Sequence, residues 1–182
     1  MKRSSRLSGV LAAALVTMFA SSASADEDAV TARLIGYQET PATINSTGSG
    51  EFRARIRDQT SIEYELTYRD LSSTALQSHI HFGRPATTGG IVLFLCTNLG
   101  NAPATVPTPQ ACPPFPATIT GTLTAADVIA LPGQGIDAAA AGFAEMLKAI
   151  RAGAAYANVH TTLHPSGEIR GLLNSRTRED DR

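Results

Sequence analysis

The sequence predicts an all-β protein, an antiparallel sandwich or barrel of about eight short strands with one amphipathic helix inserted before the penultimate strand. Two observations carry this prediction. Apolar and polar residues alternate over residues 51–57 and again over residues 62–68, which is the pattern of strands with one buried face. Clusters of Gly, Pro, Asn and Asp separate such stretches at short intervals, which is typical of antiparallel sandwiches and barrels.

The first half of the chain is expected to contain four strands, at residues 30–37, 51–57, 62–68 and 75–82. The first is followed by Pro41, which cannot donate a hydrogen bond to a strand ladder. The outer face of the second strand is rich in Arg and that of the third is rich in Glu, so the two are expected to pair as a hairpin. Residues 91–96 form a continuous apolar run typical of a buried strand, and residues 119–123 form the sixth strand.

Helical spacing appears after these six strands. Thr124 has the residue type of a helix N-cap and precedes a short turn. Residues 137–151 are rich in Ala and place four apolar side chains at helical spacing, namely Phe143, Met146, Leu147 and Ile150. We expect this helix to cover the core rather than to bind a partner. Strands at residues 156–161 and 168–173 complete the fold.

Residues 1–25 have the features of an export signal. Three basic residues precede a mostly apolar stretch at residues 7–20, which is too short to span a bilayer. Ala23-Ser24-Ala25 then matches the small residues of a cleavage site. The expected organisation is a signal peptide, one domain over residues 26–174 and a charged tail over residues 175–182. The alternative is an uncleaved membrane anchor, and no other segment is apolar and long enough to span a membrane.

The charge balance of the mature chain is mildly acidic. The 15 basic residues fall to 12 once Lys2, Arg3 and Arg6 leave with the signal, against 16 acidic residues, so the net charge becomes −4. This balance and the lack of a basic stripe argue against a nucleic-acid partner. The sequence also lacks a Gly-x-Ser-x-Gly elbow, a phosphate-binding glycine loop and a Cys-x-x-Cys pair.

The two cysteines, Cys96 and Cys112, flank a Pro-rich stretch. In an exported chain the oxidising compartment favours a disulfide between them. Closing a loop of about 15 residues stabilises a fold by roughly 3 kcal/mol. The alternative is that Cys96 is a soft ligand of a copper centre, which would need histidine partners nearby.

The four histidines of the chain form two clusters, His79-Ile80-His81 and His160-Thr161-Thr162-Leu163-His164. Alternate residues of a strand share a face, so the rings of His79 and His81 are expected to lie side by side. Imidazole is the commonest nitrogen ligand for zinc and copper. If the fold brings the clusters together, they form a nitrogen-rich metal site. Otherwise the histidines pack and hydrogen-bond as ordinary polar residues.

A metal site would place further demands on the residues around the rings. Each ligand imidazole needs a hydrogen-bond acceptor for its second nitrogen, and Asn158, Thr161 and Glu168 are the candidates. His164 lies in a turn before Pro165, where it is either a fourth ligand or an exposed turn residue.

Four parts of the chain make up a longer signature. They are Leu34-Ile35-Gly36-Tyr37-Gln38-Glu39-Thr40-Pro41; Ser78-His79-Ile80-His81-Phe82-Gly83 with Gly89-Gly90-Ile91-Val92; Ala157-Asn158-Val159-His160-Thr161; and Pro165-Ser166-Gly167-Glu168-Ile169-Arg170-Gly171. This signature resembles the CHRD family, the domain named after chordin, although Leu172 stands where the family usually has Gln. The resemblance implies an extracellular, immunoglobulin-like β-barrel. In chordin-like proteins the domain assists the binding of secreted growth factors.

The His-x-His segment, with a Gly-containing loop and a later Cys, is also similar to the copper-binding strand of Cu,Zn superoxide dismutases, which are antiparallel Greek-key barrels. This similarity implies copper ligands at His79, His81 and His160, without a counterpart of the zinc site. Arg170 would then be a catalytic residue that attracts a small anion such as superoxide toward the metal. The alternative for Arg170 is a cross-strand ion pair with Glu168.

These observations define three functional hypotheses. The first is an exported protein, periplasmic or extracellular, that binds copper through His79, His81, His160 and His164 and dismutates superoxide if the anion reaches the metal. The second is a non-catalytic extracellular binding or matrix module whose loops form the contact surface. The third is a copper carrier without turnover.

Overall fold

The structure, a computed structural model, describes residues 28–176 of the 182-residue chain, and the predicted signal peptide therefore lies outside the described residues. The strands are β1 (Asp28–Ile35), β2 (Ser49–Arg57), β3 (Ser61–Arg69), β4 (Ala75–Phe82), β5 (Gly90–Thr97), β6 (Ala117–Thr124), β7 (Ala155–Thr161), β8 (Ile169–Leu172) and β9 (Asn174–Arg176). The helix α1 (Ala139–Arg151) lies between β6 and β7, and short 3-10 turns occupy η1 (Gly36–Gln38), η2 (Ala125–Asp127) and η3 (Pro132–Gln134).

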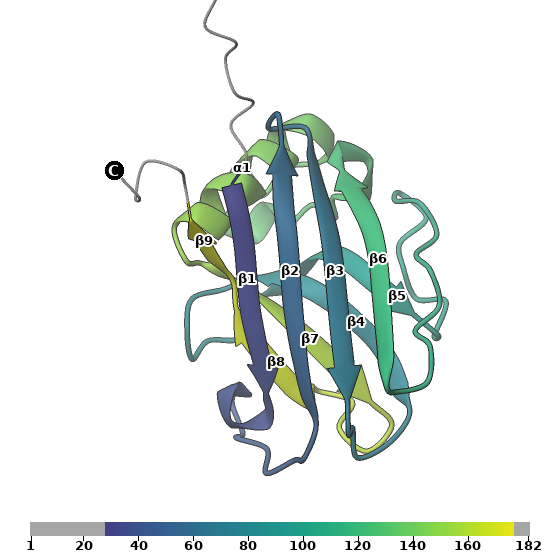
Figure 1. Ribbon diagram of the computed structural model, residues 1–182. Helices are drawn as coiled ribbons and strands as arrows, with labels where there is room; N and C mark the ends of the chain where they lie inside the picture. Colours follow the sequence, from purple (N-terminus) through teal and green to yellow (C-terminus); the bar gives the residue numbers. More distant parts are fainter. Residues whose placement is uncertain (1–27, 177–182) are drawn as a thin grey trace, which may run out of the picture.

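The strands form one antiparallel sheet in the order β5-β4-β7-β8-β1-β2-β3-β6, and β9 pairs with β1. The sheet curls into a nearly closed barrel, with β1, β2, β3 and β6 in one layer and β4, β5, β7 and β8 in the other (Figure 1). The all-β prediction, with about eight strands and one inserted helix, is therefore confirmed.

Most strand bounds agree with the alternation pattern, and the clearest difference is at the end of β1. The sequence predicted a strand through Tyr37, but the strand ends at Ile35 and the chain turns through η1. The reason is a close backbone approach at Gly36, whose carbonyl accepts hydrogen bonds from the amides of Glu39 and Ile44. A Cβ at Gly36 would lie 2.3 Å from the Ile44 carbonyl oxygen, so only glycine fits this turn.

The barrel interior is filled by the inward-facing apolar side chains of the strands. α1 lies across one end of the barrel (Figure 1), and Phe143, Met146, Leu147 and Ile150 are buried in the same core. The helix therefore covers the core, as its spacing predicted. Thr124 also has its predicted role: its side chain accepts from the Ala126 amide, and the Asp127 side chain accepts from the Thr124 amide, which makes a capping box.

The strand pairing that matters most for the site is between β4 and β7, which are neighbours although about 80 residues separate them in the chain. His81 lies opposite Tyr156, His79 lies opposite Asn158, and Gln77 lies opposite His160. This register places both histidine clusters on the same part of the sheet.

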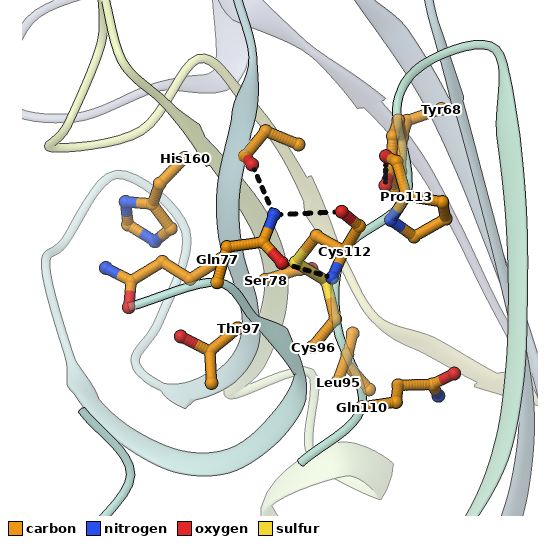
Figure 2. Close-up of a disulfide and its surroundings, with 12 residues drawn as sticks. Tyr68, Gln77, Ser78, Leu95, Cys96, Thr97, Gln110, Cys112, Pro113 and His160 are labelled. Atoms are coloured by element: carbon orange, nitrogen blue, oxygen red, sulfur yellow. Dashed lines mark hydrogen bonds between the residues drawn. A yellow bond between two sulfur atoms is a disulfide. The ribbon is translucent and has the colours of Figure 1, made fainter. Parts of the chain in front are cut away.

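The two cysteines are bonded as predicted. The sulfur atoms of Cys96 and Cys112 lie 1.98 Å apart, and no free cysteine remains among the described residues. The disulfide and its surroundings are shown in Figure 2. The Asn98 side chain donates to the Cys112 carbonyl and accepts from the Cys112 amide. The pairing leaves Cys96 without a free thiolate, so the alternative role of Cys96 as a copper ligand is wrong.

Removal of the disulfide should lower stability without unfolding the barrel. We expect the Cys96→Ser/Cys112→Ser protein to lose about 3 kcal/mol of unfolding free energy, because the cross-link restricts a loop of roughly 15 residues in the unfolded chain. Urea unfolding of the oxidised wild type and the double mutant measures the difference. A loss below about 1 kcal/mol would show that the Asn98 contacts hold the loop without the cross-link.

Candidate metal centre

Three of the four histidines, His79, His81 and His160, lie on the face of the sheet that points away from the barrel interior. Ile80 and Val159 belong to the apolar core, and His79, His81 and His160 alternate with them along β4 and β7. The three imidazoles are nevertheless buried, with exposed fractions of 0, 7 and 6%. The site is therefore a polar cluster on the outside of the barrel that other parts of the chain cover.

Three loops cover the cluster, and each makes a hydrogen bond to one of its histidines or to Asn158 beside them. Glu39, from the segment after β1, accepts from the Asn158 amide group at 2.6 Å. The loop between β4 and β5 contributes the Gly89 carbonyl, 3.0 Å from Nδ1 of His81. The turn after β7 contributes the Pro165 carbonyl, 3.0 Å from Nδ1 of His160.

The three rings face one another closely enough to share one ion. The ring centroid of His79 lies 5.4 Å from that of His81 and 5.0 Å from that of His160. One nitrogen from each of the three residues can be chosen so that all lie within 4.8 Å of one another, and this is the group that could hold a metal. The condition that the sequence left open is therefore met, because the fold brings His160 to the mid-chain pair.

The hydrogen bonds to the loop carbonyls fix the tautomers of two rings. A carbonyl oxygen only accepts, so Nδ1 of His81 and Nδ1 of His160 must carry the hydrogen. In a neutral imidazole the lone pair then lies on Nε2 of each ring. Nε2 of His160 lies 3.2 Å from Nδ1 of His79, which donates to it in the metal-free protein.

Two ring nitrogens in this group are buried without a hydrogen-bond partner among the described residues: Nε2 of His79 and Nε2 of His81. Leaving a buried polar atom unpaired costs about 1–3 kcal/mol, and native proteins do so rarely. Neutral imidazole nitrogens with free lone pairs are the donors that first-row transition metals bind. The donor set therefore fits a metal ion.

Burial keeps the rings neutral. It lowers the pKa of His79 to about 2 and that of His81 to about 4, with the neighbouring histidines adding to the effect. Burial also lowers the pKa of His160. Glu39 shows the opposite effect, because burial raises its pKa to about 7 against the influence of Asn158 and the Arg170 charge.

We expect the metal-free protein to lose stability as the pH falls below about 6.5, the ordinary pKa of histidine. In that range the unfolded histidines take up protons while the folded His79 and His81 do not, so each of these two can cost up to about 1.4 kcal/mol per pH unit, and the lowered pKa of His160 acts in the same direction. Glu39 acts in the opposite direction between pH 7 and 4.5, because there the folded state holds the extra proton. The destabilising effect of the three histidines is larger than the stabilising effect of the one carboxyl, so the free energy of unfolding falls as the pH falls.

Urea unfolding in the presence of a chelator at pH 7, 6 and 5 measures this dependence. A stability that stays flat or rises between pH 7 and 5 would contradict the neutral buried cluster.

Arg170 lies on β8 beside the cluster and is buried, with 3% of its surface exposed. Its guanidinium donates to the Thr40 hydroxyl and to the carbonyls of Arg84 and Thr87, and its Cζ lies 3.5 Å from the centre of the Tyr156 ring. All of these hydrogen-bond acceptors are neutral. The side chain is thus a buried cation that joins β8 to two of the covering loops.

The other predicted site residues occupy different surroundings. His164 is not part of the three-histidine group among the described residues; it lies in the turn, where its amide and carbonyl bond to Thr161 and Gly167. Glu168 accepts from Ser46, Ser72 and Thr161 rather than pairing with Arg170, so the alternative of that ion pair is not what the structure shows.

Sequence reasoning missed the groups that orient the rings. The acceptors were expected to be side chains of Asn158, Thr161 and Glu168, and this was wrong, because the ring nitrogens bond to the carbonyls of Gly89 and Pro165. A backbone carbonyl carries no residue-type signal. The flanking glycines and proline, which mark loops next to each cluster, were the only signal available.

The fold and the site together define a small β-barrel with a buried three-histidine centre on its outer face. The CHRD domain family matches residues 30–173, which is most of the chain. The protein therefore belongs to the CHRD-domain family. Searches among curated proteins and among solved structures found no match. Among the described residues, none of the helices combines the length and the apolar character needed to cross a membrane.

Proposed function

We propose that this protein is an exported CHRD-domain protein that binds one copper ion through His79, His81 and His160. The observation that carries the proposal is the convergence of three buried, neutral imidazoles, two of which have an unpaired nitrogen. Nδ1 of His79 and Nε2 of His160 are 3.2 Å apart. At that separation both nitrogens could bind one ion once the hydrogen on Nδ1 of His79 is released or moves to Nε2 of the same ring.

The donor set favours copper over other metals. Carboxylates, which suit magnesium, calcium and manganese, are not part of the group among the described residues. Imidazole suits zinc, copper, iron and nickel, and copper(II) has the highest affinity for a given nitrogen site among the divalent first-row metals. The similarity of the His-x-His segment to the copper strand of superoxide dismutases supports the same choice.

Export of the protein is part of the proposal. The signal-like residues 1–25 and the disulfide between Cys96 and Cys112 both fit an oxidising compartment, periplasmic or extracellular. Copper bound there would meet no reducing thiol pool of the cytosol.

Metal analysis of the purified mature protein tests copper binding. After loading with copper and removal of free ion, we expect one copper per chain in the wild type and none in His79→Ala/His81→Ala, with circular dichroism confirming that both proteins are folded. A folded wild type that holds no copper contradicts the proposal. His164→Ala is the matched control: retention of copper limits the site to three histidines, and loss of copper makes His164 the predicted fourth ligand.

Superoxide dismutation is the second candidate function, and the position of Arg170 favours it. Bound copper would supply one-electron chemistry in which one superoxide is oxidised to dioxygen and a second, with two protons, is reduced to hydrogen peroxide. Arg170 is a buried cation whose charge acts on His81. A positive potential beside the centre would attract a small anion. The loop that holds Arg84 and Thr87 would have to move for the anion to enter.

Superoxide turnover by the copper-loaded protein tests this second function. We expect the wild type to turn over superoxide and Arg170→Met, at equal copper content, to be slower. A copper-loaded wild type without turnover would be a carrier, and a protein that never binds copper would leave the non-catalytic binding module as the function.

A further inference from the structure

Tyr156 is in contact with the proposed metal ligand His81 on β4. The phenol ring stacks on the imidazole with the ring centroids 4.7 Å apart and an angle of 3° between the planes. The two residues are direct partners in the register of β4 and β7, so the strand pairing itself sets this contact. The stack fixes the plane of the His81 ring.

A second connection runs through the backbone of Gly89. The Tyr156 hydroxyl accepts a hydrogen bond from the Gly89 amide at 3.0 Å, and the Gly89 carbonyl accepts from Nδ1 of His81 at 3.0 Å. Gly89 also packs tightly on the preceding strand, since a Cβ there would lie 1.9 Å from the Phe82 carbonyl oxygen. Tyr156 thus holds the residue that fixes the tautomer of His81.

The phenol ring is itself clamped. β4 and β8 flank β7 on opposite sides, so the His81 imidazole and the Arg170 guanidinium lie on opposite faces of the Tyr156 ring. Arg170 also binds the carbonyls of Arg84 and Thr87 in the same loop as Gly89. The side chains of His81 and Arg170 therefore hold both the Tyr156 ring and the loop between β4 and β5.

We infer that Tyr156 is a positioning residue for the metal ligand His81. Its ring sets the plane of the imidazole, and its hydroxyl, through Gly89, keeps the hydrogen on Nδ1 and the lone pair on Nε2, the nitrogen left without a hydrogen-bond partner. The inference rests on the proposed metal site, but the orientation of His81 can also be measured without metal.

The experiment compares Tyr156→Phe, which keeps the ring and removes the hydroxyl, with Tyr64→Phe. Tyr64 is a matched control, because its buried hydroxyl also bonds to the backbone, at Leu95, but it belongs to the core on the other side of the sheet. We expect copper affinity to fall 10–100-fold in Tyr156→Phe, which is the usual effect of losing a residue that supports a metal ligand through hydrogen bonds. The copper(II) electron paramagnetic resonance spectrum should also change. Tyr64→Phe should keep the wild-type affinity and spectrum.

A metal-free measurement separates this inference from the copper proposal. Nitrogen-15 shifts of the His81 ring should show Nδ1 protonated in the wild type and a mixture of tautomers in Tyr156→Phe. If the wild type binds no copper, the copper proposal fails and the ring shifts alone decide the role of Tyr156. Wild-type affinity, spectrum and ring shifts in Tyr156→Phe would overturn the inference.

Discussion

Replacing His79 with leucine should abolish tight copper binding while leaving the metal-free protein as stable as the wild type, to within about 1 kcal/mol. His79 is fully buried and its Nε2 has no hydrogen-bond partner. Replacing it removes a buried unpaired polar atom, which stabilises the folded protein by about 1–3 kcal/mol. The substitution also leaves the buried Nε2 of His160 without its donor, which costs about 1–3 kcal/mol. The two effects nearly cancel.

The loss of copper affinity should be larger than the 10–100-fold that follows loss of an outer partner, because a ligand itself is removed. Competition titrations against a copper chelator measure the affinity, and urea unfolding without metal measures the stability. Phe94→Leu is the matched control, because Phe94 packs edge-on against His79 at 4.4 Å between ring centroids but offers no ligand atom. A metal-free His79→Leu protein that loses more than about 2 kcal/mol would show that His79 is structural.

Replacing Glu168 with alanine should cost at least about 3 kcal/mol of unfolding free energy. The buried carboxylate accepts four hydrogen bonds: from the Ser46 hydroxyl, the Ser72 amide and hydroxyl, and the Thr161 hydroxyl. These hydrogen bonds lower the pKa of Glu168 against the effect of burial. Alanine accepts from none of these groups, so four donors lose their acceptor. The hydrogen bonds that join the segments of Ser46, Ser72 and Thr161 to one another through Glu168 are then lost.

The same substitution should weaken copper binding. Thr161, one of the Glu168 partners, also accepts from the His164 amide at the start of the turn that carries the Pro165 carbonyl. A looser turn would hold His160 less firmly. Urea unfolding and copper titration measure the two effects, with Glu168→Gln as the milder comparison because its amide oxygen still accepts. A Glu168→Ala protein as stable as Glu168→Gln would contradict the network's role.

Eight of the nine strands could be predicted because each leaves a local pattern in the sequence, as the alternation in β2 and β3 does. β9, which pairs with β1 where the charged tail was expected to begin, has no such pattern. The pairing of His79 with His81 on one face follows from the same period of two. The place of His160 beside them could not be predicted, because the register between β4 and β7 is a long-range property. His164 shows the limit of spacing arguments: it is close to His160 in the chain but lies in a turn with its own hydrogen bonds.

The covering of the site was also beyond local pattern. A histidine on the outer face of a strand is expected to be exposed. Only the folded chain shows that the loops with Glu39, Gly89 and Pro165 cover it. The segments that carry the CHRD resemblance all meet here, through Glu39, His81, His160 and Arg170 and the residues beside them. The signature of the chain and its buried centre are the same part of the molecule.

Electron paramagnetic resonance of the copper(II)-loaded mature protein tests the central claim most directly. Three converging imidazoles predict nitrogen superhyperfine coupling to three ring nitrogens. In each single alanine variant of His79, His81 and His160 the coupling should be reduced, or lost together with the bound copper, and in His164→Ala it should be unchanged. A spectrum that keeps its nitrogen coupling when any one of the three is replaced would contradict the account.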